Sequence, residues 1–413
     1  MTAIAQSLAQ SLAQAIVSPR PAPSSICACM LVQRIIAQGI AQVIAQLIAQ
    51  SLHASTNQLK DTLMQQKVCT GIDVGRSATK AVALLAGTRT VISFPSAICP
   101  AIKLTDASAA SRASMETVKI GSHEYFTGET ALIQGRDEML GGLSDDWAGS
   151  EQHGALILAA IKRLEAAGVA GVADGVVVVG LPARVFASQR KLYAAAVSEL
   201  LPGAMVKAVP QPMGPYYTML FDDRGVERSG VEGGSWSIIE VGQFTTDFAM
   251  VERGHVVERA FNSCEGMRVA AEGLQRLVME RYGLAVSMAE ATSLLQEPLI
   301  RNFGRRIDVG DLVREAVQPL ARTIAEKARQ LFGESLRSMD GVRLAGGGAE
   351  LVMEALPSVW SGLTGVVPDG FIAVSEDARF AVADGFARFG LAFDVYRSSR
   401  IEAERIIDTA ATA

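Results

Sequence analysis

The sequence is poor in aromatic residues, cysteine and histidine, and each shortage narrows what the protein can be. Aromatic residues make up 6% of the 413 residues, so aliphatic side chains must fill the cores. The cysteines are odd in number and scattered, which argues against a disulfide framework and favours a reducing cytoplasm. They are Cys27, Cys29, Cys69, Cys99 and Cys264. The four histidines stand far apart in the sequence, so no metal cluster built by protein residues is predicted.

Several catalytic and nucleic-acid-binding signatures are also missing. No lysine follows a glycine anywhere in the chain, which excludes a Walker A loop. No G-x-S-x-G, H-E-x-x-H or C₂H₂ zinc pattern occurs. The net charge of −5 argues against a protein that grips DNA directly. The densest basic spot holds Arg301, Arg305 and Arg306, and it is either a solvated loop or a contact with a protein or a polyanion.

The length of 413 residues allows about two to three domains, and the composition suits a globular enzyme. The first 63 residues differ from the rest of the chain. They repeat a four-residue unit, as in Leu8-Ala9-Gln10-Ser11 and Ile48-Ala49-Gln50-Ser51. Such a repeat rotates about 400° on a helix, so its apolar stripe drifts off any one core. The alternatives are a low-complexity extension, an amphipathic partner or membrane helix, and a membrane span or signal. A further hypothesis is that the segment is not natively translated, because Met64 precedes the first recognisable strand; mapping the native N-terminus tests this.

A polar hairpin tip opens the globular part of the chain. Residues 67–85 read KVCTGIDVGRSATKAVALL, two β-rich runs on either side of a turn. Gly75 lets the backbone approach phosphate oxygens, and Ser77 and Thr79 belong to the same tip. Asp73 can hold the water shell of Mg²⁺, and Lys80 adds a cation for phosphate. By itself this pattern is also ordinary turn chemistry.

A second hairpin and a glycine-rich turn strengthen the prediction. Residues 235–251 read SWSIIEVGQFTTDFAMV, so Glu240 and Gly242 are spaced as Asp73 and Gly75 are. Two such hairpins can hold a triphosphate from both sides of a cleft. Further along, residues 341–350 read GVRLAGGGAE, a buried strand that ends in three glycines before a helix. Such a turn lets a flat base and ribose lie against the backbone.

The order of these motifs resembles the actin, Hsp70 and sugar-kinase superfamily, over residues 67–390. Three further segments resemble the bacterial ParM/StbA plasmid-segregation family: VVVVGLP at 176–182, VPQPMGPYY at 209–217 and SEDARFAVADGF at 375–386. The resemblance implies an α/β, actin-like (ribonuclease H-like) fold with two domains flanking a nucleotide cleft. It implies domain I at 67–234, domain II at 235–376, and a C-terminal helix with a tail, 377–413, that returns to domain I.

The resemblance also implies roles for individual residues. Asp73 and Glu240 would hold Mg²⁺ through water, and Gln211 would position the attacking water, although it also fits a plain linker residue. The phosphates and adenosine would contact Gly75, Ser77, Thr79, Lys80, Gly242, Thr245, Thr246, Asp247, Gly346, Gly347 and Gly348. Asp247 also fits a turn-stabilising role. The family normally has Asp where Glu240 stands, so we expect slow hydrolysis.

The function that follows is a cytoplasmic ATPase that binds ATP and Mg²⁺ and polymerises head to tail for plasmid segregation. Its acidic charge implies a separate DNA-binding adaptor protein, and membrane attachment is not expected. Three alternatives share the fold: a small-molecule kinase, an exopolyphosphatase-type phosphatase, and a chaperone or cell-shape homologue. A substrate-phosphorylation screen and lipid flotation distinguish these functions.

Overall fold

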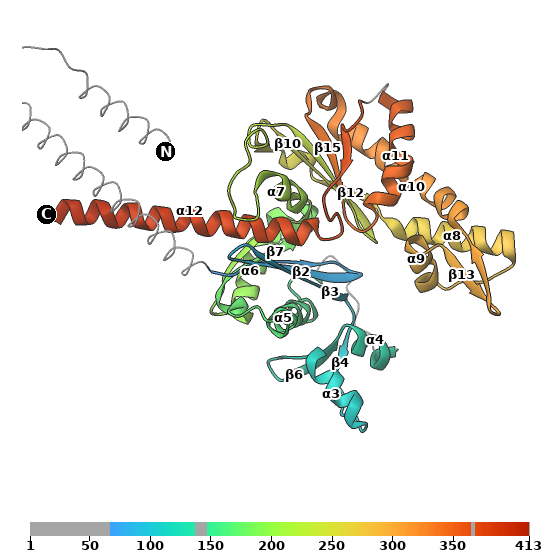
Figure 1. Cartoon of the computed structure of the whole chain (residues 1–413), viewed down its shortest axis with the longest axis horizontal. Coiled ribbons are helices and arrows are strands. Elements are labelled where there is room, and N and C mark those ends of the chain that lie inside the picture. The colour runs from blue at the N-terminus through green and yellow to red at the C-terminus, as the bar shows by residue number, and fades with distance from the viewer. Residues whose placement is uncertain (1–66, 137–146, 365–367, 413) are drawn as a thin grey trace, which may run out of the picture. The chain divides into compact units, whose positions relative to one another are not determined.

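The computed structural model describes residues 67–136, 147–364 and 368–412, and the N-terminal repeats, with Cys27 and Cys29, lie outside that range (Figure 1). Side chains of Glu334, 361–364 and 399–412 are likewise not described. Lys67–Ala413 forms one compact unit. Within the described residues, no helix has both the length and the apolar character needed to cross a membrane.

The first half is built on a five-stranded mixed sheet in the order β3-β2-β1-β7-β8. The strands are β1 (Cys69–Val74), β2 (Ala78–Leu85), β3 (Thr88–Pro95), β7 (Val176–Leu181) and β8 (Met205–Pro210). β1, β2 and β3 form an antiparallel meander, while β7 and β8 run parallel to β1. The predicted first hairpin and the predicted VVVVGL strand are therefore both present.

The second half repeats this strand order. Its sheet runs β11-β10-β9-β15-β16, with β12 paired to β10. The strands are β9 (Trp236–Val241), β10 (Thr245–Glu252), β11 (His255–Val256), β12 (Asn262–Glu265), β15 (Gly341–Ala345) and β16 (Ile372–Val374). Again a hairpin is followed by parallel strands, since β15 pairs parallel to β9 and to β16. The second predicted hairpin and the predicted strand before the glycines are present.

Helices cover both faces of the first sheet. Strand β7 is buried on its two faces: Val177 and Val179 contact the core beneath α5 (Glu151–Ala166) and α6 (Ala183–Leu200), whereas Val176 and Val178 contact α12 (Ala381–Thr412). Side chains alternate along a strand, so a continuous valine run fits a strand covered on both sides. The C-terminal helix therefore packs on the first sheet, and it begins at Ala381.

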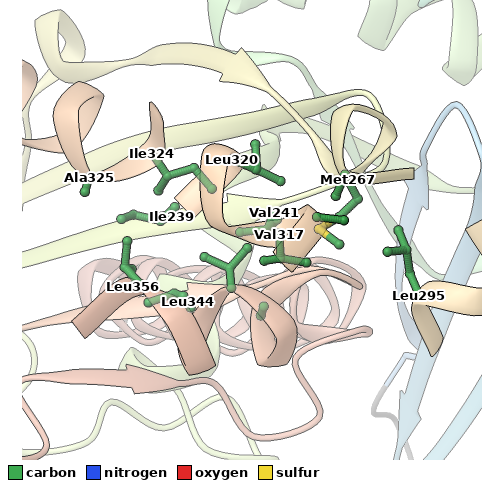
Figure 2. Close-up of a cluster of buried hydrophobic side chains, with 14 of the residues drawn as sticks. Ile239, Val241, Met267, Leu295, Val317, Leu320, Ile324, Ala325, Leu344 and Leu356 are labelled. Atoms are coloured by element: carbon green, nitrogen blue, oxygen red, sulfur yellow. The ribbon is translucent and has the colours of Figure 1, made fainter. Parts of the chain in front are cut away.

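In the second half, one large apolar cluster lies between the sheet and four helices (Figure 2). These are α8 (Met267–Tyr282), α9 (Met288–Gln296), α10 (Gly310–Phe332) and α11 (Ala349–Thr364). The apolar spacing at 268–282 and 310–332 predicted α8 and α10, and both are present. Figure 2 shows Leu320 and Ile324 of α10 and Ile239 of β9 among the side chains of this cluster.

Two elements were not predicted from the sequence. A small sheet, β4 (Ile98–Pro100), β6 (His123–Thr127) and β5 (Thr117–Ile120), carries α3 (Ala107–Glu116) and α4 (Glu129–Gly135). The arginine-rich spot, interpreted from the sequence as a solvated loop or a contact site, is a hairpin of β13 (Leu299–Asn302) and β14 (Arg305–Asp308). Short strands of mixed polarity carry too weak a period-2 signal to be distinguished from loop.

The two halves are joined by only two stretches of chain within the described residues. The first is η4 (Gln211–Met213) with α7 (Gly214–Leu220), which leads through an irregular segment to β9. The second leads from β16 into α12. The two stretches contact each other at Gly214 and Gly385, where a Cβ added to Gly385 would lie 1.8 Å from the carbonyl oxygen of Gly214. Only glycine permits so close an approach of two backbones.

Ion pairs fix the start of α12 on the first sheet. Arg89 donates to Asp377 at 2.7 Å and to Asp384 at 2.9 Å, and Arg388 also pairs with Asp384 at 3.0 Å. Asp384 is buried, so its charge needs these partners. Phe386 is fully buried and lies against Gly180 of β7. Contacts within the fold thus explain Asp377, Asp384, Gly385 and Phe386 of the SEDARFAVADGF segment.

Candidate functional site

Both predicted hairpins and the glycine turn open onto a single cavity of about 560 Å³. The cavity lies between the two halves of the compact unit, because strands of both sheets contribute to its lining. Eleven of the residues predicted from the sequence line it: Asp73, Gly75, Ser77, Lys80, Gln211, Glu240, Gly242, Thr245, Asp247, Gly347 and Gly348. The structure therefore brings together segments that are up to 275 residues apart, from Asp73 to Gly348.

In the first hairpin, Asp73 is the centre of a small polar network. Its Oδ2 accepts a hydrogen bond from Lys80 Nζ at 3.2 Å, and its Oδ1 accepts one from Gln211 Nε2 at 3.2 Å. Asp73 and Lys80 are register partners across the hairpin, so both side chains point to the same face. Asp73 thus positions the cation and the amide that were predicted to act on phosphate and water.

The second hairpin places an acid where the first has its lysine. Glu240 and Asp247 are register partners, in the positions that Asp73 and Lys80 occupy in the first hairpin. Thr245 Oγ1 donates to Asp247 Oδ2 at 2.9 Å. The turns also match: a Cβ on Gly75 or on Gly242 would lie 2.9 Å from the carbonyl oxygen three residues ahead. Two similar turns thus present different charges to one cavity.

The acids of the second hairpin are held in an unfavourable environment when no cation is near. Burial raises the pKa of Glu240 to about 8; Lys80 opposes this effect, and Asp247 and Asp73 add to it. Burial also raises the pKa of Asp247 to about 6, against the hydrogen bond from Thr245. When one of two neighbouring carboxylates is ionised, repulsion raises the free energy of ionising the other. The site therefore favours a proton or an added cation beside Glu240.

This environment predicts a pH-dependent stability. Because the folded-state pKa of Glu240 lies above its ordinary value, the folded protein binds more protons than the unfolded one between pH 4.5 and 8. Stability should therefore fall as pH rises from 6.5 to 8, by about 1 to 2 kcal/mol. Thermal unfolding of the wild-type chain and of Glu240→Gln, which cannot ionise, measures this. If the free energy of unfolding changed with pH equally in both proteins, the raised pKa would not belong to Glu240.

Between pH 6.5 and 8 the effect of Glu240 on stability can be distinguished from that of a second buried group, His153. Burial lowers the pKa of His153 to about 3, and its Nδ1 has no hydrogen-bond partner. Since that folded-state pKa lies below the ordinary value of 6.5, His153 stabilises the fold above pH 6.5 and this contribution is lost as pH falls. Its effect is opposite in sign and changes by only about 0.4 kcal/mol between pH 6.5 and 8, less than the change expected from Glu240.

The donor set fits Mg²⁺ delivered with phosphate rather than a preformed metal centre. In the part of the chain that the structure describes, no three Asp, Glu, His or Cys side chains are arranged to hold a metal ion. Mg²⁺ commonly takes one or two carboxylates, keeps several waters and shares phosphate oxygens. Asp73, Glu240 and Asp247 supply the carboxylates, and their mutual repulsion favours a divalent cation.

The three glycines of the turn after β15 have separate reasons to be glycine. Gly346 has φ +89°, and a Cβ there would lie 2.4 Å from the carbonyl oxygen of Val241. A Cβ on Gly348 would lie 2.4 Å from Cγ of Met267. At Gly347 nothing lies within 4 Å of such a Cβ, and its φ is not positive. The fold therefore explains Gly346 and Gly348, and leaves Gly347 to be explained by what enters the cavity.

Three residues predicted to contact the ligand do not line the cavity. The Thr79 hydroxyl lies 2.9 Å from that of Ser96, and the Thr246 hydroxyl donates to the carbonyl of Glu265 at 2.9 Å. Each threonine precedes, by one position, a residue that faces the cavity, so strand alternation turns it to the opposite face. Gly346 has a structural role, because its N–H donates to the carbonyl of Ala378, which precedes α12, at 2.8 Å.

Several lining residues were not predicted from the sequence. Arg76 and Arg184 both line the cavity, and their charges oppose the rise that burial causes in the pKa of Asp247. At the glycine end, Gln243 Nε2 donates to Thr292 Oγ1 at 3.2 Å, and Gln296 Nε2 to the carbonyl of Gly347 at 3.4 Å. Thr292 and Gln296 are spaced i, i+4 on α9, which places them on one helix face. Uncharged residues at this spacing give no chemical signal in a sequence.

Two stretches of the sequence match models of known protein families. Residues 71–214 match a family model described as the N-terminal domain of actin-like proteins. Residues 238–358 match one described as archaeal actin homologue MreB-like, C-terminal. The two matches end and begin on either side of the irregular segment that joins the halves. No curated protein matches the chain in sequence.

Solved structures of actin homologues are similar in fold over most of the chain. Ta0583, an archaeal actin homologue, has 20% identity and a TM-score of 0.57 over 78% of this chain and 98% of that chain. A ParM filament from Clostridium botulinum has 18% identity and a TM-score of 0.57, covering 79% and 99% of the two chains. The actin-like protein Alp7A has 15% identity and a TM-score of 0.62, covering 81% and 98%.

Identities this low show the fold alone. That fold is the mixed α/β, actin-like fold with two sheet-based halves, as predicted. Two stretches of the chain match models of actin-like proteins, and the chain from Lys67 onward has the actin-like fold.

Proposed function

We propose that the chain is an ATPase that binds ATP with Mg²⁺ in the cavity and assembles into filaments that segregate plasmids. The observation that carries the proposal is the pairing of two similar hairpins on one cavity. One presents Asp73 with Lys80, and the other presents Glu240 with Asp247. A lysine suits the negative phosphates, and the opposed acids suit the cation that accompanies them.

The predicted residues that line the cavity have definite tasks in this proposal. Lys80 binds a phosphate oxygen, held in place by Asp73. Gln211 orients the attacking water, because its amide is fixed by the other oxygen of Asp73. Bound Mg²⁺ would neutralise charge on the phosphates. Gly75, Ser77, Gly242, Thr245, Gly347 and Gly348 complete the ligand contacts.

Glu240 is the reason to expect slow hydrolysis. A Cβ on Gly346 would lie 2.5 Å from Glu240 Oε1, so the carboxylate is folded back against the glycine turn. Its extra methylene, relative to aspartate, gives it this reach. A carboxylate held there is less well placed to share a cation with Asp73, and Mg²⁺ tolerates misplaced ligands poorly.

Known relatives support nucleotide binding and assembly. One structure of Ta0583 is a complex with ADP, and one ParM structure, from Bacillus thuringiensis, is with AMPPNP. The ParM from Clostridium botulinum is described as a 15-stranded filament. In this chain, loss of the γ-phosphate would remove contacts between the halves and so weaken subunit contacts. A separate adaptor protein would connect the filament to DNA.

Light scattering at 90° on the full-length chain with Mg²⁺ tests the proposal, using ATP, ADP or no nucleotide. We expect a rise with ATP that decays as ATP is consumed, and none without nucleotide. Nucleotide binding is measured in parallel by titration. Bound nucleotide without any rise, at every protein concentration, would contradict the filament and direct attention to a phosphorylated small-molecule substrate.

A further inference from the structure

The β13–β14 hairpin ends in a side chain that contacts nothing in its own fold. Phe303 is 101% exposed. It and Gly304 form the two-residue turn, with φ values of +48° and +80°. A turn with two positive φ values normally has Asn or Asp followed by Gly, so phenylalanine is a costly choice. Figure 1 shows the hairpin at the edge of the second half, beside α8 and α9.

The charges beside Phe303 are also unfavourable for the hairpin alone. Arg301 and Arg306 are register partners, and Arg305 adjoins the turn. Like charges directly opposite one another destabilise a strand pair. Among the described residues, none of the three arginines forms an ion pair. An exposed aromatic ring beside several arginines is the composition typical of a binding hot spot.

A complementary surface lies where an acidic loop packs on α12. A Cβ on Gly225 would lie 2.6 Å from the backbone N of Ala392, so the loop touches this helix. Val226 in this loop and Val395 and Tyr396 on α12 are exposed, Tyr396 to 66%. We name these three residues the apolar face. Residues 222–227 carry three carboxylates and one guanidinium, a net charge of −2, whereas residues 301–306 carry +3.

We propose that the Phe303 tip of one copy docks on the apolar face of the next copy, with its arginines beside the acidic loop. The two surfaces are different, so the contact is heterologous and leads to an open polymer unless the rotation closes. Figure 1 shows the hairpin and the exposed part of α12 on opposite sides of the described fold, which suits head-to-tail addition. This proposal rests on the proposed filament function and names its contact.

The substitution Phe303→Asn tests the tip without weakening the turn, because Asn is preferred at this turn position. We expect thermal stability to be retained and the critical concentration for ATP-dependent pelleting to rise at least about tenfold. Leu192→Asn is the matched control: Leu192 is 76% exposed, and it lies on α6, which contributes to neither surface. The control should assemble as the wild type does.

Mixing two variants tests the pairing itself. Phe303→Asn keeps an intact apolar face, and Tyr396→Ser keeps an intact tip. Below these raised critical concentrations neither variant should pellet alone, but an equimolar mixture should form a 1:1 dimer by analytical ultracentrifugation, because one good contact remains. Raising the salt concentration should weaken that dimer, since its charges are exposed.

Three outcomes would overturn the contact. The first is normal assembly of both variants, and the second is a mixture that stays monomeric although each variant binds nucleotide. The third is loss of duplex-DNA binding by Phe303→Asn with assembly unchanged, which would make the tip a DNA contact. Failure of the filament proposal looks different, because the wild-type chain would then bind nucleotide and never pellet.

Discussion

Replacing Gly347 by valine should lower the affinity for ATP and ADP by about 100-fold or more while the protein remains as stable as the wild type. The reason is the open space at this position, where nothing lies within 4 Å of an added Cβ and the backbone is not left-handed. A side chain there costs the fold nothing. It occupies the cavity beside Gly348, where a base or ribose would lie against the backbone. Calorimetric titration with nucleotide and thermal unfolding together measure both quantities.

Gly348→Ala is the control that separates the two roles of this turn. Its added Cβ would lie 2.4 Å from Cγ of Met267, so this variant should lose stability as well as affinity. If Gly347→Val bound nucleotide as tightly as the wild type, the nucleoside would not lie on this turn. The assignment of Gly346, Gly347 and Gly348 as an adenosine motif would then fail.

Replacing Asp73 by asparagine should reduce ATP turnover by about 100-fold or more and weaken binding much less. Asp73 accepts hydrogen bonds from Lys80 and from Gln211. An amide has one acceptor oxygen and would turn its NH₂ toward one of these two donors, so either the cation or the water-positioning amide is displaced. Single-turnover hydrolysis with bound ATP measures the chemical step separately from binding.

Asp106→Asn is a suitable control because it makes the same chemical change far from the cavity. Asp106 caps α3, where its Oδ1 accepts from the backbone N of Ala109, and asparagine caps a helix equally well. Turnover by this control should equal that of the wild type. An Asp73→Asn protein that hydrolyses ATP at the wild-type rate would exclude Asp73 from the catalytic machinery.

The sequence was most informative where a chemical motif coincided with a strong period. Both hairpins, the strand before Gly346 and helices α8 and α10 were predicted, because alternating or 3.6-period apolar residues flanked the polar tips. The β13–β14 hairpin was read as a solvated loop or a contact site. Its strands are short and carry arginines where apolar residues would have revealed a sheet.

Within the site, strand geometry would have corrected part of the prediction. Lys80 and Asp247 are the register partners of Asp73 and Glu240, so the residues next to them, Thr79 and Thr246, must face the other way. Arg184 and the α9 residues could not be found in this manner. Their place in the cavity depends on how two halves close around it, and no local pattern encodes that.

The glycine contact between α7 and α12 limits how the cavity can open. The halves are joined by two stretches of chain, and these cross where the backbones of Gly214 and Gly385 touch. A rotation of one half about this crossing leaves the contact intact, whereas a translation would separate the two backbones or drive them together. The motion that the fold permits most readily is therefore a rotation with a fixed pivot, and the cavity walls farthest from the glycines would travel the greatest distance.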